Sequence, residues 1–417
     1  MQPSCRFCAA PLEHTFVDLG SAPPCQRHLT PAELEGPEVF HPLHVRVCAR
    51  CFLVQLPEVL RPEEIFGTGD YAYFSAYSDS WVAHARRFAE RAIERQGLGP
   101  ASRVVEIASN DGYLLQHFAA RGVPVLGIEP AANCAAAARA RGIPSWVEFF
   151  GEAVARRVVA EHGAPDLVVA NNVLAHVPDL HDFVAGLAVL LGGGGVASLE
   201  FPHLLRLVLG NQFDTIYHEH YSYLGFGSVD ELFRHHGLAI VDVEELPTHG
   251  GSLRVTARRK EFDRPAATPA VAELLERERA AGMRDLRWYQ GFGERVAATR
   301  RALLGFLIAA RGEGRRVAAY GAPGKGNTLL NFCGIRGDLI EYTVDRSPHK
   351  QGNYLPGSRI PIFAPERIFE TRPDYVVILP WNLEAEIREQ MAGIAAWGGR
   401  FVIPIPELRV VAGEVAR

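Results

Sequence analysis

Short apolar runs alternate with helical segments from residue 102 onward, and this alternation constrains the fold more than any other feature of the chain. "SRVVEIAS" (102–109) and "VPVLGIEP" (123–130) have the length and β-branched content of buried strands, and a segment with helical periodicity follows each of them. Strands that alternate with helices form a parallel sheet covered on both faces. The sequence therefore predicts an α/β fold, with a Rossmann-like central domain over residues 67–262.

Two further patterns extend this organisation toward the C-terminus. "LAIVDVEELPTHGGSLRVTARR" (238–259) is typical of two strands joined by a Gly-Gly turn, which predicts an antiparallel hairpin at the end of the sheet. Residues 263–312 have helical periodicity and are predicted to form a connector. Strand–helix alternation resumes at "RRVAAYGAPGKGNTLLNF" (315–332), so residues 313–417 are predicted to form a C-terminal Rossmann-like α/β domain.

The first 66 residues contain two C-x-x-C pairs, "CRFC" and "CARC". The chain has seven cysteines, and this odd number argues against a framework of disulfides. Two pairs of thiolates on tight turns can close a tetrahedron around zinc, and four cysteine ligands leave no open coordination position. The sequence thus predicts a small zinc-binding module over residues 1–66 that holds a structural metal. Its predicted ligands are Cys5, Cys8, Cys48 and Cys51.

Composition excludes several classes of partner. The 417 residues carry a net charge of −5, so no long-range attraction to nucleic acids or anionic membranes is expected. No apolar stretch approaches the roughly 18 residues that a membrane span needs, and the first residues show no signal-peptide pattern. We therefore expect a cytoplasmic protein with neither nucleic acid nor membrane as a partner. We also expect a monomer, on which the composition has no bearing.

Acidic side chains stand at the ends of the first two predicted strands. Glu106 and the loop 109–112 end the first, and Glu129 ends the second. Ligands of open α/β sheets bind beyond the carboxyl ends of the strands, where an acid can accept both hydroxyls of a ribose. Because G-x-G-x-x-G is absent, the loop offers little backbone to cradle a pyrophosphate. S-adenosylmethionine (SAM) therefore fits better than a dinucleotide, although these residues alone leave the dinucleotide open.

"DTIYHEHYSYLG" (214–225) combines three tyrosines, two histidines and a glutamate without any lysine or arginine. A packing segment does not need so many titratable groups, and a solvated loop does not need so many rings. The stretch is therefore a candidate for the chemistry of the protein.

The order of the motifs resembles one enzyme family along nearly the whole chain. Two C-x-x-C pairs, "EIASNDGYLL", "NNVLAHV", "YHEHYSY", "GGSLRV" and "YGAPGKGN" follow one another. This series is similar to that of the zinc-containing sugar C-methyltransferases, which methylate C3 of nucleotide-linked 4-keto-deoxyhexoses. The resemblance implies a class I SAM methyltransferase domain in the centre, SAM and structural zinc as cofactors, and a nucleotide-linked keto-deoxysugar, with dTDP as the expected nucleotide, as substrate.

The resemblance also implies the residues of the sites. The catalytic residues are Tyr71, His176, Tyr217, Glu219 and His220. The cofactor-binding residues are Glu106, Ser109, Asn110, Asp111, Gly112, Glu129, Pro130, Asn171 and Asn172. The substrate-binding residues are Tyr73, Lys325, Asn327, Lys350 and Asn353.

C-methylation requires a carbon nucleophile, and this requirement gives the histidine-rich cluster a role. A base removes a proton from the carbon next to a ketone and leaves an enolate. Histidine suits this role because its pKa lies near neutral pH. The enolate oxygen needs a hydrogen-bond donor, which a tyrosine or a neutral histidine supplies. We favour His220 as the base, with Tyr217 or His176 polarising the C4 carbonyl.

Simpler interpretations stand beside these. His176 could instead cap the turn that follows a strand. His218 and Tyr221 could face the apolar core, and Tyr73 and Tyr77 could be aromatic residues that only pack against neighbours. Three other histidines are interpreted as surface or structural groups: His235, His236 and His249. "YGAPGKGN" comes close to a dinucleotide fingerprint, so an NAD-dependent oxidoreductase acting on a nucleotide sugar is the rival function. The loop with Lys350 and Asn353 could also be a solvent-exposed polar loop with no role in binding.

Overall fold

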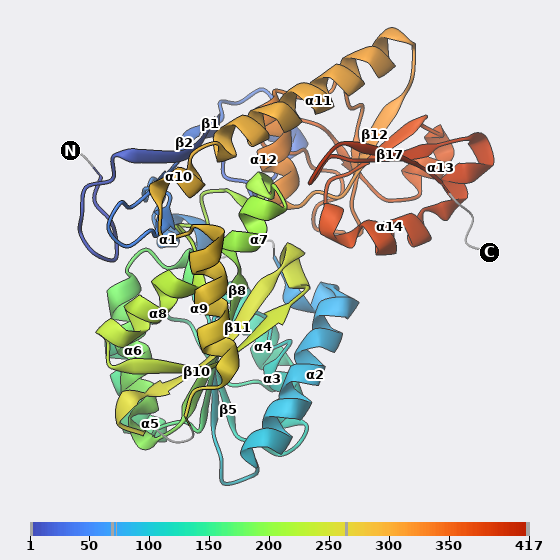
Figure 1. Ribbon diagram of the computed structural model, residues 1–417. Coiled ribbons are helices and arrows are strands. Elements are labelled where there is room, and N and C mark those ends of the chain that lie inside the picture. Colours follow the sequence, from blue (N-terminus) through green and yellow to red (C-terminus); the bar gives the residue numbers. More distant parts are fainter. Residues whose placement is uncertain (1–2, 68–70, 72, 263–265, 414–417) are drawn as a thin grey trace. The chain divides into compact units, whose positions relative to one another are not determined.

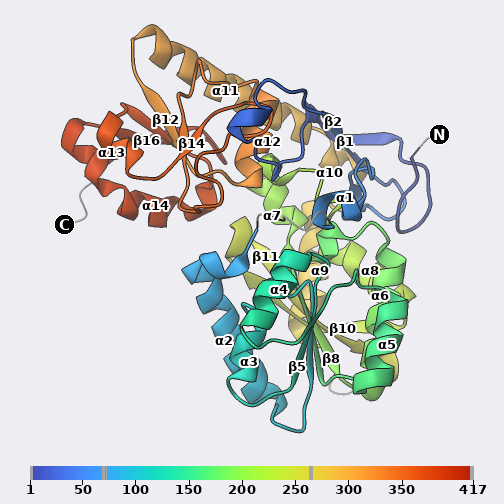
Figure 2. The same ribbon diagram turned by 180° about the vertical axis from the view of Figure 1, so that it is seen from behind.

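The computed structural model describes residues 3–67, 71, 73–262 and 266–413 (Figures 1 and 2). It contains two compact units, each assembled from separate stretches of the chain. Unit 1 comprises Met1–His14, Val47–Leu205 and Glu219–Trp288, and unit 2 comprises Thr15–Arg46, Arg206–His218 and Tyr289–Arg417. The four sequential domains expected from the sequence stay a prediction.

A seven-stranded sheet forms the centre of unit 1, in the order β10-β11-β8-β7-β4-β5-β6. The strands are β4 (Val104–Ile107), β5 (Val125–Ile128), β6 (Ser145–Trp146), β7 (Leu167–Asn171), β8 (Val196–Pro202), β10 (Leu238–Leu246) and β11 (Ser252–Arg259). The five strands β4, β5, β6, β7 and β8 are parallel to one another, whereas β11 pairs antiparallel with both β8 and β10. The predicted parallel sheet with a terminal hairpin is thus confirmed. The strand order reverses between β4 and β7, where open α/β sheets bind ligands.

Helices cover both faces of this sheet (Figure 1). One face packs against α2 (Asp79–Gln96), α3 (Leu115–Ala119) and α4 (Ala132–Ala140). The other packs against α5 (Glu152–His162), α6 (Leu180–Leu190), α8 (Phe226–His235) and α9 (Pro269–Ala281). Two apolar layers therefore hold the strand ends of unit 1 in fixed positions.

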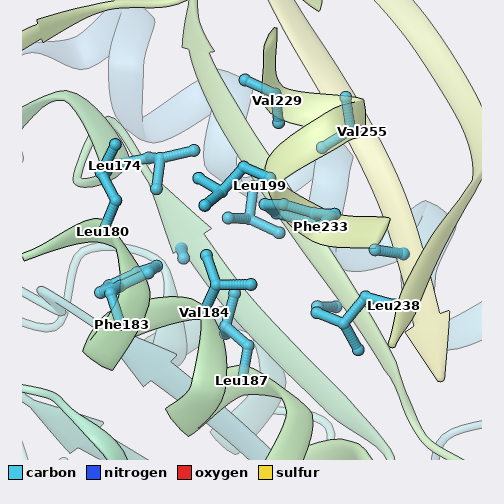
Figure 3. Close-up of a cluster of buried hydrophobic side chains, with 14 of the residues drawn as sticks. Leu174, Leu180, Phe183, Val184, Leu187, Leu199, Val229, Phe233, Leu238 and Val255 are labelled. Atoms are coloured by element: carbon cyan, nitrogen blue, oxygen red, sulfur yellow. The ribbon is translucent and has the colours of Figure 1, made fainter. Parts of the chain in front are cut away.

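Helix α6 shows how the sequence builds one of these layers. Leu180, Phe183, Val184 and Leu187 recur at helical spacing, are buried, and point into one apolar cluster (Figure 3). Burying each such side chain contributes about 1.5–3 kcal/mol. The chain just before α6 carries His176 in a short 3-10 turn, Leu174–His176, and Leu174 anchors that turn in the same cluster.

A buried carboxylate caps helix α8. Its N-cap residue is Gly225, which has no side chain to accept the first N–H groups. Glu278 of α9 accepts instead, from the backbone N–H of Phe226 at 2.6 Å and of Gly227 at 2.8 Å, and Nε2 of His203 lies 2.7 Å from the same carboxylate. One side chain thus satisfies two buried helix donors.

Substituting Glu278→Ala is expected to lower the free energy of unfolding by about 2–4 kcal/mol, because it leaves two buried N–H groups and His203 unpaired. Glu276→Ala is the matched control on the same helix. Glu276 is exposed and pairs with Arg279, so its loss should cost at most about 1 kcal/mol. Denaturant unfolding measures both variants, and equal losses would contradict the capping role.

Unit 2 contains a six-stranded sheet in the order β14-β13-β12-β15-β16-β17. The strands are β12 (Val317–Tyr320), β13 (Thr343–Val344), β14 (Ile362–Phe363), β15 (Tyr375–Ile378), β16 (Arg400–Ile403) and β17 (Arg409–Ala412). All pairs are parallel except β16 with β17. Helices α11 (Phe292–Gly312), α12 (Gly324–Cys333), α13 (Arg367–Thr371) and α14 (Glu384–Gln390) belong to the same unit, as do most residues of β1 (His14–Ala22) and β2 (His41–Val47). The predicted C-terminal Rossmann-like fold is confirmed.

Candidate active site

The four predicted zinc ligands come together in unit 1. Their sulfur atoms all lie within 4.8 Å of one another, with Cys5 and Cys51 3.5 Å apart and Cys8 and Cys48 3.4 Å apart. Gln55 of β3 (Val54–Gln55) donates to the sulfur of Cys5 at 3.1 Å. Four converging thiols with such an outer donor are the ligand set of a closed, structural zinc site.

The loop after β4 has the backbone of a glycine-rich loop with only one glycine. Ala108, Asn110 and Gly112 have φ values of 56°, 50° and 78°, so alternate residues adopt the left-handed conformation. Glycine usually occupies such positions because other residues pay about 1–2 kcal/mol there. Two hydrogen bonds offset this cost at Asn110, whose side chain accepts from the N–H of Ser75 at 2.9 Å and donates to the Tyr73 carbonyl at 3.1 Å.

Glu129, at the end of β5, holds this loop in place. Its two oxygens accept from the backbone N–H of Asn110 and of Ala131, each at 2.8 Å. Burial raises the pKa of Glu129 to about 7, although these two hydrogen bonds oppose the shift. Each oxygen retains a second lone pair that could accept a hydroxyl.

Several buried polar atoms around the same sheet edge have no hydrogen-bond partner among the residues that the structure describes. They are both carboxyl oxygens of Glu106, Oγ of Ser109, Oδ1 of Asp111, and Oδ1 of Asn171 and of Asn172. Burial, together with Glu129 and Asp111, raises the pKa of Glu106 well above its usual value. Orphaned polar groups concentrated at one strand edge are suited to a ligand with several hydrogen-bonding groups.

The catalytic candidates Tyr71, His176, Glu219 and His220 lie close together in unit 1. The hydroxyl of Tyr71 donates to Oε2 of Glu219 at 3.3 Å. The rings of His176 and His220 meet edge to face with 4.6 Å between their centroids. Phe66, the last residue of α1 (Pro62–Phe66), contacts the rings of both Tyr71 and His176.

Burial gives His176 a defined protonation state. It lowers the pKa of His176 to about 4, although the backbone of Glu219 opposes the shift through a hydrogen bond. At neutral pH the ring is therefore neutral, with one N–H to donate and one lone pair.

The segment around Tyr71 connects this cluster to the cofactor loop. Nδ2 of Asn133 donates to the Tyr71 carbonyl at 2.9 Å, and the N–H of Ala76 donates to Asp111 at 3.3 Å. Together with the bonds of Asn110, these contacts fix the segment that carries Tyr71 beside the loop that follows β4. Asn133 has no recognisable motif of its own, so the sequence did not reveal its part in this arrangement.

Comparison with known proteins identifies the family. Three family models match consecutive segments: "Putative zinc binding domain" over residues 5–66, "Methyltransferase domain" over 81–243 and "C-methyltransferase C-terminal domain" over 247–406. The chain is also 39% identical over 413 residues to the C-methyltransferase NovU of Streptomyces niveus, with 98% of this chain and 97% of that one covered. The chain belongs to the zinc-containing, SAM-dependent C-methyltransferases.

Other matches cover less than half of the chain. The Ubiquinone biosynthesis O-methyltransferase of Burkholderia pseudomallei is 27% identical over 162 residues, which is 36% of this chain and 70% of that one. A solved SAM-dependent methyltransferase of Clostridium acetobutylicum covers 44% of this chain and 93% of its own, at 13% identity and a TM-score of 0.36.

The methyltransferase uses SAM and a structural zinc ion, as predicted. The rival function as an NAD-dependent oxidoreductase is set aside by the family. Among the helices within the described residues, none is long and apolar enough to cross a membrane.

The other members of the histidine-rich stretch divide between the two units. The chain passes from unit 2 into unit 1 between His218 and Glu219, so Tyr217 belongs to unit 2. His218 and Tyr221 are buried, in agreement with the core interpretation. Tyr221 donates its hydroxyl to the Leu60 carbonyl at 2.9 Å within unit 1. Tyr73 and Tyr77, by contrast, are 42% and 59% exposed, and the Tyr77 ring contacts that of Phe74, so their interpretation as packing aromatics stays a prediction.

The predicted substrate-binding residues of the C-terminal domain have partners within unit 2. Nζ of Lys325 donates to Asn382 at 2.7 Å and lies 4.8 Å from the centroid of the Trp381 ring. Asn327 is buried and donates to the carbonyl of Cys25. Two further contacts are those of Lys350 with the Ala322 carbonyl and of Asn353 with the His349 carbonyl. Their role toward a substrate stays a prediction.

A buried ionic network near the carboxyl end of β8 was not foreseen. Glu200 accepts from Arg254 at 2.6 Å and from Thr248 at 2.7 Å, and Nε2 of His84 lies 2.9 Å from the same carboxylate. The carbonyl of Glu200 also accepts from the N–H of Asn172 at 2.6 Å. The only signal in the sequence was a charged residue within each of the two runs "ASLEF" and "SLRVT".

Proposed function

We propose that this C-methyltransferase transfers the methyl group of SAM to C3 of a nucleotide-linked 4-keto-deoxysugar, most simply a dTDP sugar, through an enolate. The reaction would serve the biosynthesis of a branched deoxysugar for a natural product such as an antibiotic. The grouping of Tyr71, His176, Glu219 and His220 beside the cofactor loop supports this proposal most strongly. We also propose that the enzyme acts as a cytoplasmic monomer.

In this proposal His220 is the base that takes the C3 proton. The electron pair of the C3–H bond becomes the C3–C4 double bond, and the C4 carbonyl becomes the enolate oxygen. His176, whose ring lies 4.6 Å from that of His220, is one candidate donor to this oxygen, and its neutral ring would have to give up the hydrogen bond to the Glu219 backbone in order to donate. Tyr217 is the second candidate donor. Glu219, which accepts from Tyr71, orients the cluster.

The cofactor site follows from the orphaned groups at the sheet edge. SAM supplies an electrophilic methyl group, which C3 accepts while S-adenosylhomocysteine is left. We assign its ribose hydroxyls to Glu129, and its remaining polar groups to the other cofactor residues predicted from the sequence: Glu106, Ser109, Asn110, Asp111, Gly112, Pro130, Asn171 and Asn172. Within the described part of the chain, both oxygens of Glu106 and the amide oxygens of Asn171 and Asn172 are buried without a hydrogen-bond partner, which supports this assignment.

When S-adenosylhomocysteine binds near pH 6.5, the Glu129 carboxyl group is expected to release a proton. In the free enzyme its pKa is about 7, so below that pH the carboxyl is mostly protonated. Ribose hydroxyls that donate to the carboxylate favour the ionised form and lower this pKa. The release should vanish above about pH 8, and affinity should fall as the pH drops below 7. Calorimetry in buffers of different ionisation enthalpy measures it, and unchanged release in Glu129→Gln would contradict the assignment.

The nucleotide diphosphate is proposed to contact the C-terminal domain, with Tyr73 contacting the sugar. Lys325 and Lys350 supply positive charge for the phosphates, and Asn327 and Asn353 supply amide donors. Lys325 lies in the first turn of α12, a position that suits an anion-binding role.

Hydrogen exchange at C3 tests the proposal without requiring methyl transfer. Enolisation precedes transfer, so wild-type enzyme with the keto-sugar and S-adenosylhomocysteine in deuterated water should introduce deuterium at C3. A mass-spectrometric screen of dTDP-, GDP- and UDP-linked 4-keto-deoxyhexoses with SAM identifies the substrate by the gain of one methyl group. Methylation at oxygen, or methylation of carbon without exchange, would overturn the enolate route.

A further inference from the structure

Three histidines outside the proposed catalytic cluster converge in unit 1. His181 is the second residue of α6, His235 is the last residue of α8, and His236 follows it. One ring nitrogen from each lies within 4.8 Å of the others, and in the described part of the chain only this group and the four cysteines have such a ligand arrangement. His235 is exposed, in agreement with its interpretation as a surface group, and the convergence of the three rings adds an arrangement that the sequence did not reveal.

Hydrogen bonding determines which nitrogen of His181 is available to a metal. Its Nε2 lies 2.7 Å from the carbonyl oxygen of Phe7, which can only accept, so Nε2 carries the proton. The lone pair of the neutral ring is therefore on Nδ1, and this atom lies 2.9 Å from Nε2 of His236. Histidines that bind metals usually donate their other N–H to a carbonyl or a carboxylate in this way.

The spacing of the rings fits a tetrahedral ion. The three centroid separations are 5.2 Å for His181 and His235, 5.1 Å for His181 and His236, and 5.1 Å for His235 and His236. With zinc–nitrogen bonds of about 2.0 Å, a ring centroid stands about 3.2 Å from the ion, and two such rings are then about 5.2 Å apart. Aligning the ring nitrogens on a common ion thus requires mainly rotation of the rings, and His235 is exposed and can rotate.

We propose that His181, His235 and His236 form a second metal site, for a divalent cation of the zinc class with a water in the fourth position. Imidazole nitrogens select zinc, nickel and copper over magnesium and calcium. The site is separate from the cysteine site but connected to it, because Phe7 lies between the ligands Cys5 and Cys8. An ion here would join the start of α6, the end of α8 and the first cysteine turn.

Titration with Zn²⁺ tests the site in the full-length enzyme with its cysteine-bound zinc in place. Wild-type enzyme should take up one further Zn²⁺ per chain by calorimetry, with a rise in melting temperature. The double variant His235→Gln, His236→Gln should bind this ion at least a hundredfold more weakly, and His235→Gln alone at least tenfold. His235 is exposed, so its single variant should fold normally.

Elemental analysis and a control variant complete the test. All variants should retain the zinc of the four cysteines after mild chelation. His349→Gln removes an exposed histidine of unit 2 and should leave the uptake of the further ion unchanged. Wild-type enzyme that takes up no further zinc, or the same uptake in wild type and double variant, would overturn the proposal.

Discussion

Exchanging His220 for asparagine is expected to lower methyl transfer by about a hundred- to ten-thousand-fold, the usual cost of removing a general base. Deuterium exchange at C3 should fall with it, because both reactions need the same deprotonation. Asparagine keeps hydrogen-bonding groups but has no basic nitrogen. Binding of S-adenosylhomocysteine should persist, since the proposed cofactor residues lie on the strand ends and loops of the central sheet. Mass spectrometry and calorimetry measure these quantities separately.

Tyr217→Phe distinguishes the role of His220 from that of its neighbour. The tyrosine variant should lose less exchange than His220→Asn if Tyr217 only donates to the enolate oxygen. Normal exchange in His220→Asn with none in Tyr217→Phe would make the tyrosine the base, within the same set of residues. If neither substitution affects exchange, the stretch is structural, and the base must be sought at His176 or Tyr71.

The fold could be predicted because its signals are local. The apolar run around Glu106 and the Gly-Gly turn at 250–251 each identify an element from a few neighbouring residues, and the order of these elements determines the sheet. The grouping of the chain into two compact units could not be predicted in this way. Unit 2, for example, combines residues 15–46 with residues 206–218 and 289–417, and contacts between such distant stretches leave no periodic trace in the sequence.

The sequence predicts which residues form the site, and that membership stays a prediction, but it does not predict how these residues are arranged in space. The hydrogen bond from Tyr71 to Glu219 joins residues 148 positions apart, which no spacing rule anticipates. The loop after β4 is a clearer example, since Ala108 and Asn110 take the positive φ values for which a sequence reader expects glycine. The absence of a G-x-G-x-x-G motif argued correctly against a dinucleotide, yet the backbone retains a glycine-type turn because Glu129 and the segment near Ser75 hold Asn110.

Cys48→Ser is expected to abolish zinc binding at the four-cysteine site and to destabilise the enzyme by several kcal/mol. Zinc contributes about 10–16 kcal/mol of apparent folding free energy in isolated zinc-finger peptides, where the unfolded chain has no preformed site. The effect here should be smaller because the cysteines also pack against a large core: Cys5, Cys48 and Cys51 belong to the same apolar cluster as Leu53 and Phe233. Zinc content after mild chelation and the melting temperature provide the measurement, and strong chelators should lower the melting temperature of the wild type as well.

Cys333→Ser is the matched control, because Cys333 is equally buried but belongs to unit 2 and is not a member of this apolar cluster. This variant should keep the zinc of the four-cysteine site. Its free energy of unfolding should fall by about 1–3 kcal/mol, the cost of placing a hydroxyl in an apolar site. Cys48→Ser differs because it both removes a metal ligand and frees the turn that carries Cys51. If Cys48→Ser loses its zinc yet melts at the wild-type temperature, the metal has little structural weight, and the apolar contacts of Cys5, Cys48 and Cys51 alone hold the module.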